Sequence, residues 1–208
     1  MKIAIIGASA GIGSETVRLA LQRGHTVKAL SRNNAPLAEH QSLTKINGTA
    51  LSVADLKTVI ADTDVVIVTV GTKVKKGTKL FSELAKALVV AISETAYKGN
   101  VLIVSGFGTG DSAGYLNLFM RLIIRFFLKD QYKDKTLMEK IISESKLNWE
   151  FIKPGMLTNG PLDTSYKVIT ELYQGIKVNK ISRASVADYL VNEAEAPRHL
   201  LDHVLLSS

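Results

Sequence analysis

Lys2-Ile3-Ala4-Ile5-Ile6-Gly7-Ala8-Ser9-Ala10-Gly11-Ile12-Gly13 opens the chain as an apolar run that leads into a glycine loop. The helical pattern Ser14–Gln22 follows at once. A strand, a tight turn and a helix in this order form the context in which such a loop binds the pyrophosphate of a dinucleotide. Gly7 can turn the chain, Gly11 lets the backbone approach the phosphates, and Gly13 lets the helix lie close to the sheet. The alternative is that these glycines only form a turn and bind no ligand. The complete βαβ unit that the loop opens favours the dinucleotide-binding interpretation.

The composition is that of one folded domain. At 208 residues, 46% of them hydrophobic and only 4 of them proline, the chain is neither disordered nor fibrous. It has no cysteine, which excludes disulfides, a thiol nucleophile and a zinc-cysteine site, and its 4 histidines are scattered, so no metal site is expected. A strand at residue 2 leaves no room for a signal peptide, and no apolar run has the length of a membrane span. We expect a cytoplasmic protein.

The sequence alternates strand-like and helix-like segments, which predicts the α/β class: a Rossmann-type, doubly wound, mainly parallel sheet with helices on both faces. We find no linker or repeat, so residues 1–208 are expected to form a single domain. A helix is expected over Asp134–Ser145, with Leu137, Ile141 and Ile142 facing inward.

The residues that follow the second strand bear on the choice of cofactor. Thr26–Leu30 is the predicted strand, and Ser31, Arg32 and Asn33 come directly after it. A carboxylate at this place would bind the ribose 2'-hydroxyl of NAD, whereas arginine can pair with the 2'-phosphate of NADP. NADP(H) is therefore preferred over NAD(H). If Arg32 merely faces solvent, the preference is open.

Other cofactor contacts follow from the rule that ligands lie beyond the carboxyl ends of the strands. Thr49 and Ala50 can flank the adenine after the third strand. The β-branched run Val65–Val70 predicts a central strand, so that Val70, Gly71 and Thr72 border the ribose and phosphates. Ser105 ends the strand Val101–Val104 and points to the nicotinamide position, and Pro154 ends the strand Asn148–Lys153. A hydroxyl that only bonds its own turn is the alternative for Ser105.

The chain has a formal charge of +7, and two of its segments contain clustered basic residues. Lys73, Lys75, Lys76 and Lys79 share one loop, which is either a solvated loop or an attractor of anions. The apolar segment Tyr115–Leu128 carries Arg121 and Arg125. A helix on a membrane surface, a helix over the substrate cleft and a subunit contact are the alternatives there, and its short length favours the last two. No basic stripe interleaved with aromatic residues suggests nucleic acid.

Several motifs together resemble a known family. They are the glycine loop, Leu30-Ser31-Arg32-Asn33, Asp64–Gly71, Val104-Ser105-Gly106-Phe107-Gly108, Ser145–Thr158 and Ile181-Ser182-Arg183-Ala184-Ser185-Val186-Ala187-Asp188. The chain resembles the atypical short-chain dehydrogenases/reductases of the NAD(P)H-binding, NmrA-like group, which includes flavin reductases of the biliverdin reductase B type. The resemblance implies a Rossmann domain whose C-terminal part, from about residue 155 to 208, is a small lobe that completes the substrate cleft. It also implies bound NADPH and hydride transfer to a small acceptor such as a flavin or a quinone.

The sequence departs from that family at the catalytic positions. The Tyr-x-x-x-Lys pattern of the short-chain enzymes is absent, because Tyr132 precedes Lys135 by one residue too few. Gly106 and Gly155 stand where biliverdin-type reductases have serine and histidine. We expect Ser105 to be a polar contact near the nicotinamide, with Lys135 or Glu139 as a proton or ribose partner; exposed charges on a helix are the alternative for these two.

Three functions are compatible with these residues. The first is an NADPH-dependent oxidoreductase, with flavin as one substrate that the resemblance allows. The second is a non-catalytic NAD(P)-binding redox sensor or regulatory protein, which the NmrA-like group and the missing tyrosine pattern suggest. The third is a relative of sugar-nucleotide epimerases, against which the short C-terminal part and the missing tyrosine argue. A monomer or a homodimer is expected.

Overall fold

A single eight-stranded sheet forms the centre of the computed structural model, which describes all residues from Met1 to Ser208. The strand order is β3-β2-β1-β4-β5-β6-β10-β8, and every neighbouring pair is parallel except β10 with β8. The strands are β1 (Lys2–Ile6), β2 (Thr26–Ser31), β3 (Leu43–Asn47), β4 (Val65–Val68), β5 (Asn100–Val104), β6 (Asn148–Pro154), β8 (Lys167–Ile169) and β10 (His203–Ser207). The first six have the Rossmann order, so the predicted fold class is confirmed.

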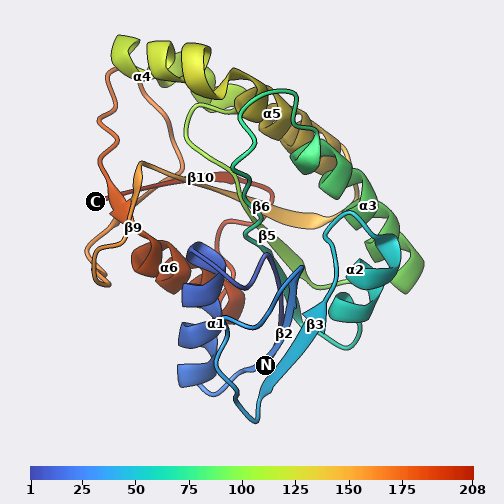
Figure 1. Cartoon of the computed structure of the whole chain (residues 1–208). Coiled ribbons are helices and arrows are strands. Elements are labelled where there is room, and N and C mark those ends of the chain that lie inside the picture. Colours follow the sequence, from blue (N-terminus) through green and yellow to red (C-terminus); the bar gives the residue numbers. More distant parts are fainter.

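Helices cover both faces of the sheet (Figure 1). On one face lie α1 (Ile12–Gln22) and α6 (Arg183–Glu195), and on the other lie α2 (Val53–Ile60), α3 (Leu80–Thr95) and α5 (Lys129–Ser143). A short second sheet joins β7 (Leu157–Thr158) to β9 (Ile181–Ser182). Because both faces are covered, the central strands are buried on both sides and read as continuous apolar runs.

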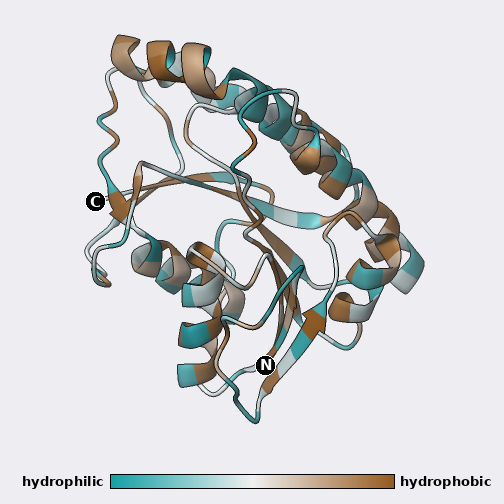
Figure 2. Ribbon diagram, viewed as in Figure 1, coloured by the Kyte–Doolittle hydropathy of each residue, from teal (hydrophilic) through white to brown (hydrophobic).

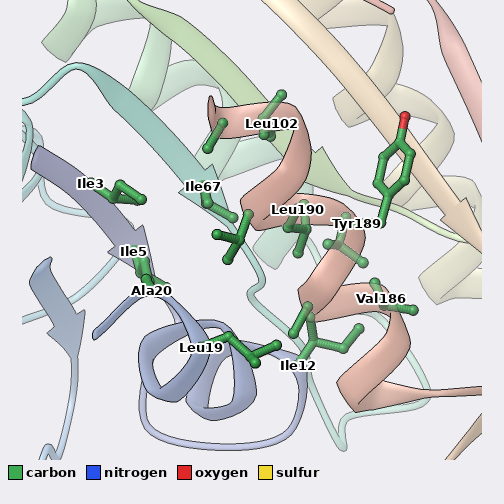
Figure 3. Close-up of a cluster of buried hydrophobic side chains, with 14 of the residues drawn as sticks. Ile3, Ile5, Ile12, Leu19, Ala20, Ile67, Leu102, Val186, Tyr189 and Leu190 are labelled. Atoms are coloured by element: carbon green, nitrogen blue, oxygen red, sulfur yellow. The ribbon is translucent and has the colours of Figure 1, made fainter. Parts of the chain in front are cut away.

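The core is divided by the sheet into two layers. Figure 3 shows the layer under α1 and α6, where Ile5 of β1 and Ile67 of β4 meet Leu190 of α6. The opposite layer contains Leu84 and Leu88 of α3, as the helical spacing of these leucines implies. Burial of such side chains, at about 25 cal/mol per Å² of apolar surface, is the main force that holds the layers together.

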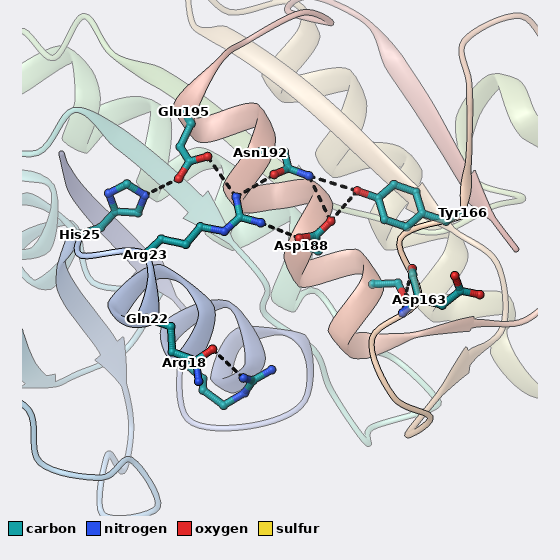
Figure 4. Close-up of polar contacts among 10 residues, drawn as sticks. Arg18, Gln22, Arg23, His25, Asp163, Tyr166, Asp188, Asn192 and Glu195 are labelled. Carbon is teal, nitrogen blue, oxygen red and sulfur yellow. Dashed lines mark hydrogen bonds and ion pairs between the residues drawn. The ribbon is translucent and has the colours of Figure 1, made fainter.

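Polar side chains fix α1 against α6 at the edge of this layer (Figure 4). The Arg23 guanidinium, just beyond α1, lies 2.6 Å from Asp188 and 3.0 Å from Glu195 of α6. The Tyr166 hydroxyl donates to the other oxygen of Asp188 at 3.0 Å. The shared carboxylate therefore ties three segments that are far apart in sequence.

The segment between β5 and β6 differs from its prediction in two ways. A 3-10 helix, Gly110–Tyr115, comes first, and then α4 (Leu118–Ile123) and a π-helix (Ile124–Leu128) run into α5. The expected start of α5 at Asp134 is thus five residues too late. The expectation that Leu137 faces inward is wrong, since its side chain is 45% exposed. Met138 and Ile142 form the buried side of α5 instead, because they face the core layer that contains α3.

A buried carboxyl lies in the middle of β6. Glu150 is fully buried and accepts a hydrogen bond of 2.7 Å from the Tyr189 hydroxyl, while its second oxygen has no partner. Burial raises the pKa of Glu150 to about 8; the Tyr189 hydrogen bond opposes this rise, and the charge of Glu193 adds to it. Glu193 is itself buried and pairs with Arg198. Glu150 is therefore protonated in the folded protein at neutral pH.

Glu150→Gln tests this protonation through stability. The folded pKa of about 8 lies above the ordinary value of 4.5, so the extra stability is present below pH 4.5 and is lost as the pH rises through 8. The substitution should remove this decline, which amounts to about 1.4 kcal/mol for each pKa unit by which the two values differ. Urea unfolding across the pH window measures it. Glu144→Gln, at an exposed position, is the control, and an unchanged decline in Glu150→Gln would contradict the assignment.

Candidate functional site

The glycine loop is built by three backbone positions that accept no larger residue. Gly7 and Gly11 have φ angles of +86° and +61°, in the left-handed region that glycine adopts without strain. A Cβ on Gly13 would lie 2.2 Å from the Gly7 carbonyl oxygen and 2.6 Å from the Thr69 hydroxyl. The start of α1 therefore rests directly on the end of β1 and on the residue that follows β4.

This close approach leaves a row of amides free. The amide of Gly7 donates to the Leu30 carbonyl at 2.9 Å, and the amide of Ser9 donates to the Ser31 hydroxyl at 3.0 Å. The amides of residues 10 to 13 make no hydrogen bond within the protein. Together with the partial positive charge at the helix start, they form a cradle for an anion such as a pyrophosphate.

The last residue of β2 and the two residues that follow it lie beside this cradle. Ser31 is buried and holds the loop through Ser9, whereas Arg32 and Asn33 are exposed. Arg32 takes part in no ion pair, so its guanidinium is free for a ligand. The Asn33 side chain accepts a bond from the Ala35 amide and shapes the turn.

The other predicted cofactor contacts lie at the same edge of the sheet. Val70 borders Gly7, since a Cβ on that glycine would lie 2.9 Å from the Val70 amide nitrogen. Gly71 and Thr72 continue this loop on the surface. Thr49 and Ala50 are half-buried beyond β3, and the Thr49 amide donates to Asp55 at 2.8 Å. Pro154 is buried at the end of β6, where its carbonyl accepts a bond from the Phe107 amide.

Arg183 is a further neighbour of the glycine loop. The sequence predicted no role for it beyond its place in the family motif. Arg183 is the first residue of α6, and its Nε would lie 3.6 Å from a Cβ on Gly11. Its guanidinium donates to the Asn159 side chain at 2.7 Å. These residues line an open hollow of about 450 Å³ between the starts of α1 and α6. The tertiary fold thus adds a positive charge to the glycine loop.

The three predicted catalytic residues lie together where the middle of α5 passes the end of β5. The Ser105 hydroxyl donates to Glu139 at 2.5 Å, and the Thr109 hydroxyl donates to the same carboxylate. The second oxygen of Glu139 forms an ion pair of 3.1 Å with Lys153 of β6, and both side chains are almost fully buried. The hydroxyl of Ser105 is thus engaged in a network that joins β5, β6 and α5.

Lys135 and Tyr132 converge on the next residue of the chain. The Lys135 ammonium donates to the Ser105 carbonyl at 2.8 Å and lies 5.0 Å from the centre of the Phe81 ring. A Cβ on Gly106 would lie 3.7 Å from the Lys135 nitrogen and 3.8 Å from the Tyr132 hydroxyl. Residues three apart share a helix face, so the pair meets although its spacing differs from Tyr-x-x-x-Lys.

Burial changes the acidity of both groups. It lowers the pKa of Lys135 to about 8, and the negative charge of Glu139 opposes this fall. It raises the pKa of the Tyr132 phenol, which therefore keeps its proton at neutral pH. The two groups offer proton donors beside Gly106. The sequence predicted no role for Lys153, and Tyr132 was considered only as part of an absent Tyr-x-x-x-Lys pattern. A lysine within the mostly apolar strand Asn148–Pro154 was the feature that could have indicated Lys153.

The profile of the NAD(P)H-binding family matches residues 7–197, nearly the whole chain. The chain belongs to the NAD(P)H-binding family. The glycine cradle, which a Cβ would fill, fits the phosphates that this family binds.

The protein shares its fold with several reductases of known structure. A short-chain dehydrogenase/reductase from Veillonella parvula in complex with NADP is 18% identical, with a TM-score of 0.85 over 100% of this chain and 94% of the other. An anaerobillin reductase from Escherichia coli O157:H7 is 20% identical (TM-score 0.82; 100% and 97%). A proposed NADH-flavin reductase from Streptococcus pneumoniae is 24% identical (TM-score 0.78; 100% and 99%). None of the helices here has the length and apolar character needed to cross a membrane.

Gly13→Ala tests whether the glycine loop forms the anion cradle. The added methyl would overlap the Gly7 carbonyl, so α1 must move away from β1, and the free energy of unfolding should fall by about 1 to 3 kcal/mol. NADPH should raise the melting temperature of the natural protein but not that of the variant. Gly114→Ala is the control, because its Cβ would meet open space. A Gly13→Ala protein that still binds NADPH as tightly would refute this account of the loop.

Proposed function

We propose that the protein is an NADPH-dependent oxidoreductase that transfers hydride to a small acceptor such as a flavin or a quinone. One observation carries the proposal: the anion cradle and the proton donors occupy the same edge of the sheet. The cradle follows β1 and the donors lie beside Gly106, just after β5, with only β4 between these strands. Strands are about 4.8 Å apart, so roughly 10 Å separate the two strand ends.

The glycine loop, Arg32 and Arg183 would hold the cofactor, each through a different group. Free amides of the loop suit the pyrophosphate, and the unpaired guanidinium of Arg32 suits the 2'-phosphate of NADP. Arg183 would add a charge beside Gly11. When bound, NADPH supplies the hydride. Membership of the NAD(P)H-binding family and the NADP-bound relative from Veillonella parvula support this choice.

Lys135 would serve as the proton donor. Its ammonium is held at a defined place by the Ser105 carbonyl and by the Phe81 ring. With a pKa of about 8 it is protonated at neutral pH and yet readily gives up its proton. Glu139, fixed by Lys153 and Ser105, positions the strand ends rather than meeting the acceptor, because it is buried.

Arg32→Asp tests the preference for NADP(H). The natural protein should bind NADPH more tightly than NADH, and the carboxylate should reverse this order by repelling the 2'-phosphate and accepting bonds from the 2'-hydroxyl. A change of at least about tenfold in the ratio of the two Kd values corresponds to one charged hydrogen bond. Calorimetric titration with both nucleotides measures it. Lys86→Asp, exposed on α3, makes the same change of charge away from the site and should leave the ratio alone. Equal affinities in the natural protein would sink the assignment.

The pH profile of turnover tests the role of Lys135. Consumption of NADPH with a flavin or a quinone should fall as the pH rises through about 8, because the ammonium loses its proton there. Lys135→Met should lose on the order of a hundredfold in kcat and the fall with pH. Lys133→Met, exposed on the same helix, should keep both. Tight NADPH binding without turnover over a broad panel of acceptors would favour the non-catalytic sensor instead.

A further inference from the structure

An uncovered apolar surface lies on the helix that connects the candidate site to α5. Four large side chains are more than half exposed: Leu118 (73%), Phe119 (68%), Phe126 (70%) and Phe127 (62%). On the inner side of this helix, Met120 and Ile124 pack against a small hydrophobic cluster that is separate from the two core layers. Figure 2 shows the hydrophobic colour of this outer helix, at the rim of the molecule. The exposed side therefore has no partner within the chain.

Basic residues run beside these apolar side chains. Arg121, Arg125, Lys129 and Lys133 recur every four residues along α4, the π-helix and α5, and all four are exposed. Leu118, Leu122 and Phe126 follow the same interval in a neighbouring row. Residues four apart share a helix face, so a basic row and an apolar row lie side by side.

In the tertiary structure, the loop of residues 72–79, which we call the lysine loop, lies against this helix. The Gly77 amide donates to Asp130 at 2.7 Å, and the Gln131 side chain donates to the Val74 carbonyl at 2.6 Å. These contacts hold the loop against the first turn of α5. The exposed Lys73, Lys75, Lys76 and Lys79 thus join the four basic residues of the helix. We call residues 72–79 and 117–133 together the basic apolar surface.

The charge of this surface equals that of the entire protein. Its two segments hold eight basic residues and one acidic residue, Asp130, a balance of +7, and the formal charge of the chain is also +7. The remaining residues are therefore neutral in sum. None of the eight basic side chains takes part in an ion pair, although ten such pairs occur elsewhere. The surface presents unpaired positive charge to whatever covers its apolar side chains.

We propose that the basic apolar surface binds the face of a membrane that contains anionic phospholipids. Aromatic and aliphatic side chains that enter the headgroup boundary, flanked by lysine and arginine, are the features of a helix that lies on a bilayer. A second copy of the chain is the weaker candidate, because a symmetric contact through this surface would bring two charges of +7 together. The binding concerns the surface of the bilayer only, in agreement with the lack of a spanning helix. It is independent of the proposed turnover of NADPH.

Sedimentation with vesicles tests the proposal on the full chain. The protein should sediment with vesicles of equal parts phosphatidylglycerol and phosphatidylcholine, and far less with vesicles of phosphatidylcholine alone. Added salt should weaken this binding, since exposed charges are screened. Lys75→Glu with Lys76→Glu should lower the partition coefficient at least roughly tenfold, because each basic residue near the surface contributes to binding. Phe126→Ser with Phe127→Ser should lower it as well, at unchanged charge.

Matched variants separate the surface from general effects of charge and apolarity. Lys86→Glu with Lys98→Glu changes the net charge equally at exposed sites elsewhere, and Tyr173→Ser removes another exposed ring. These variants should sediment as the natural protein does. Equal losses in the controls, equal binding to both kinds of vesicle, or no binding would overturn the proposal. A dimer in analytical ultracentrifugation that Phe126→Ser dissociates would also overturn it, because a second copy would then cover the surface.

Discussion

The contact between Gly13 and the Gly7 carbonyl is the constraint on which the rest of the structure depends. At this contact α1 starts immediately above the end of β1 and beside Thr69, with no room for a side chain. The close approach turns the amides at the start of α1 toward the carboxyl edge of the sheet, where an anion can meet them. α1 also packs against α6, and Arg183, the first residue of α6, lies beside Gly11. The glycine loop therefore combines free amides with a neighbouring positive charge.

The second half of the site is held by buried polar groups. Glu139 links Ser105 of the β5 exit, Lys153 of β6 and its own helix, α5. Burial of an ion pair contributes little net stability, but removal of one partner leaves an uncompensated charge, typically at a cost of about 3 to 5 kcal/mol. The pair therefore favours the arrangement of β5, β6 and α5 in which its two charges meet. Lys135, one turn before Glu139 on α5, is thereby held at Gly106, where its own pKa is lowered by burial.

The distribution of charge gives the molecule two different sides. The glycine loop, α1 and α6 form a surface in which acidic and basic groups pair, as Arg23 does with Asp188 and Glu195. The lysine loop and the helix before α5 carry unpaired positive charge together with exposed apolar side chains. Neither segment is exceptional when taken alone, and Tyr115–Leu128 would be assigned to a cleft or a subunit contact from its length. Asp130 and Gln131, which hold the loop on the helix, combine the two.

The sequence alone determined the fold class and the position of the glycine loop whose free amides form the anion cradle. Strand and helix periodicity and the glycine loop are local patterns, set by steric limits within a few residues, so they are legible along the chain. The resemblance to NAD(P)H-binding proteins is confirmed by the family match, whereas the roles of Arg32, Ser105 and Glu139 stay predictions. The inward direction of Leu137 was wrong, because the face that α5 buries is chosen by α3 and not by the periodicity of α5. Only the tertiary structure decided that Lys153 meets Glu139, that Tyr132 and Lys135 meet at Gly106, and that the lysine loop joins the apolar helix. These contacts connect residues on different elements, and their distances depend on packing that no local pattern records.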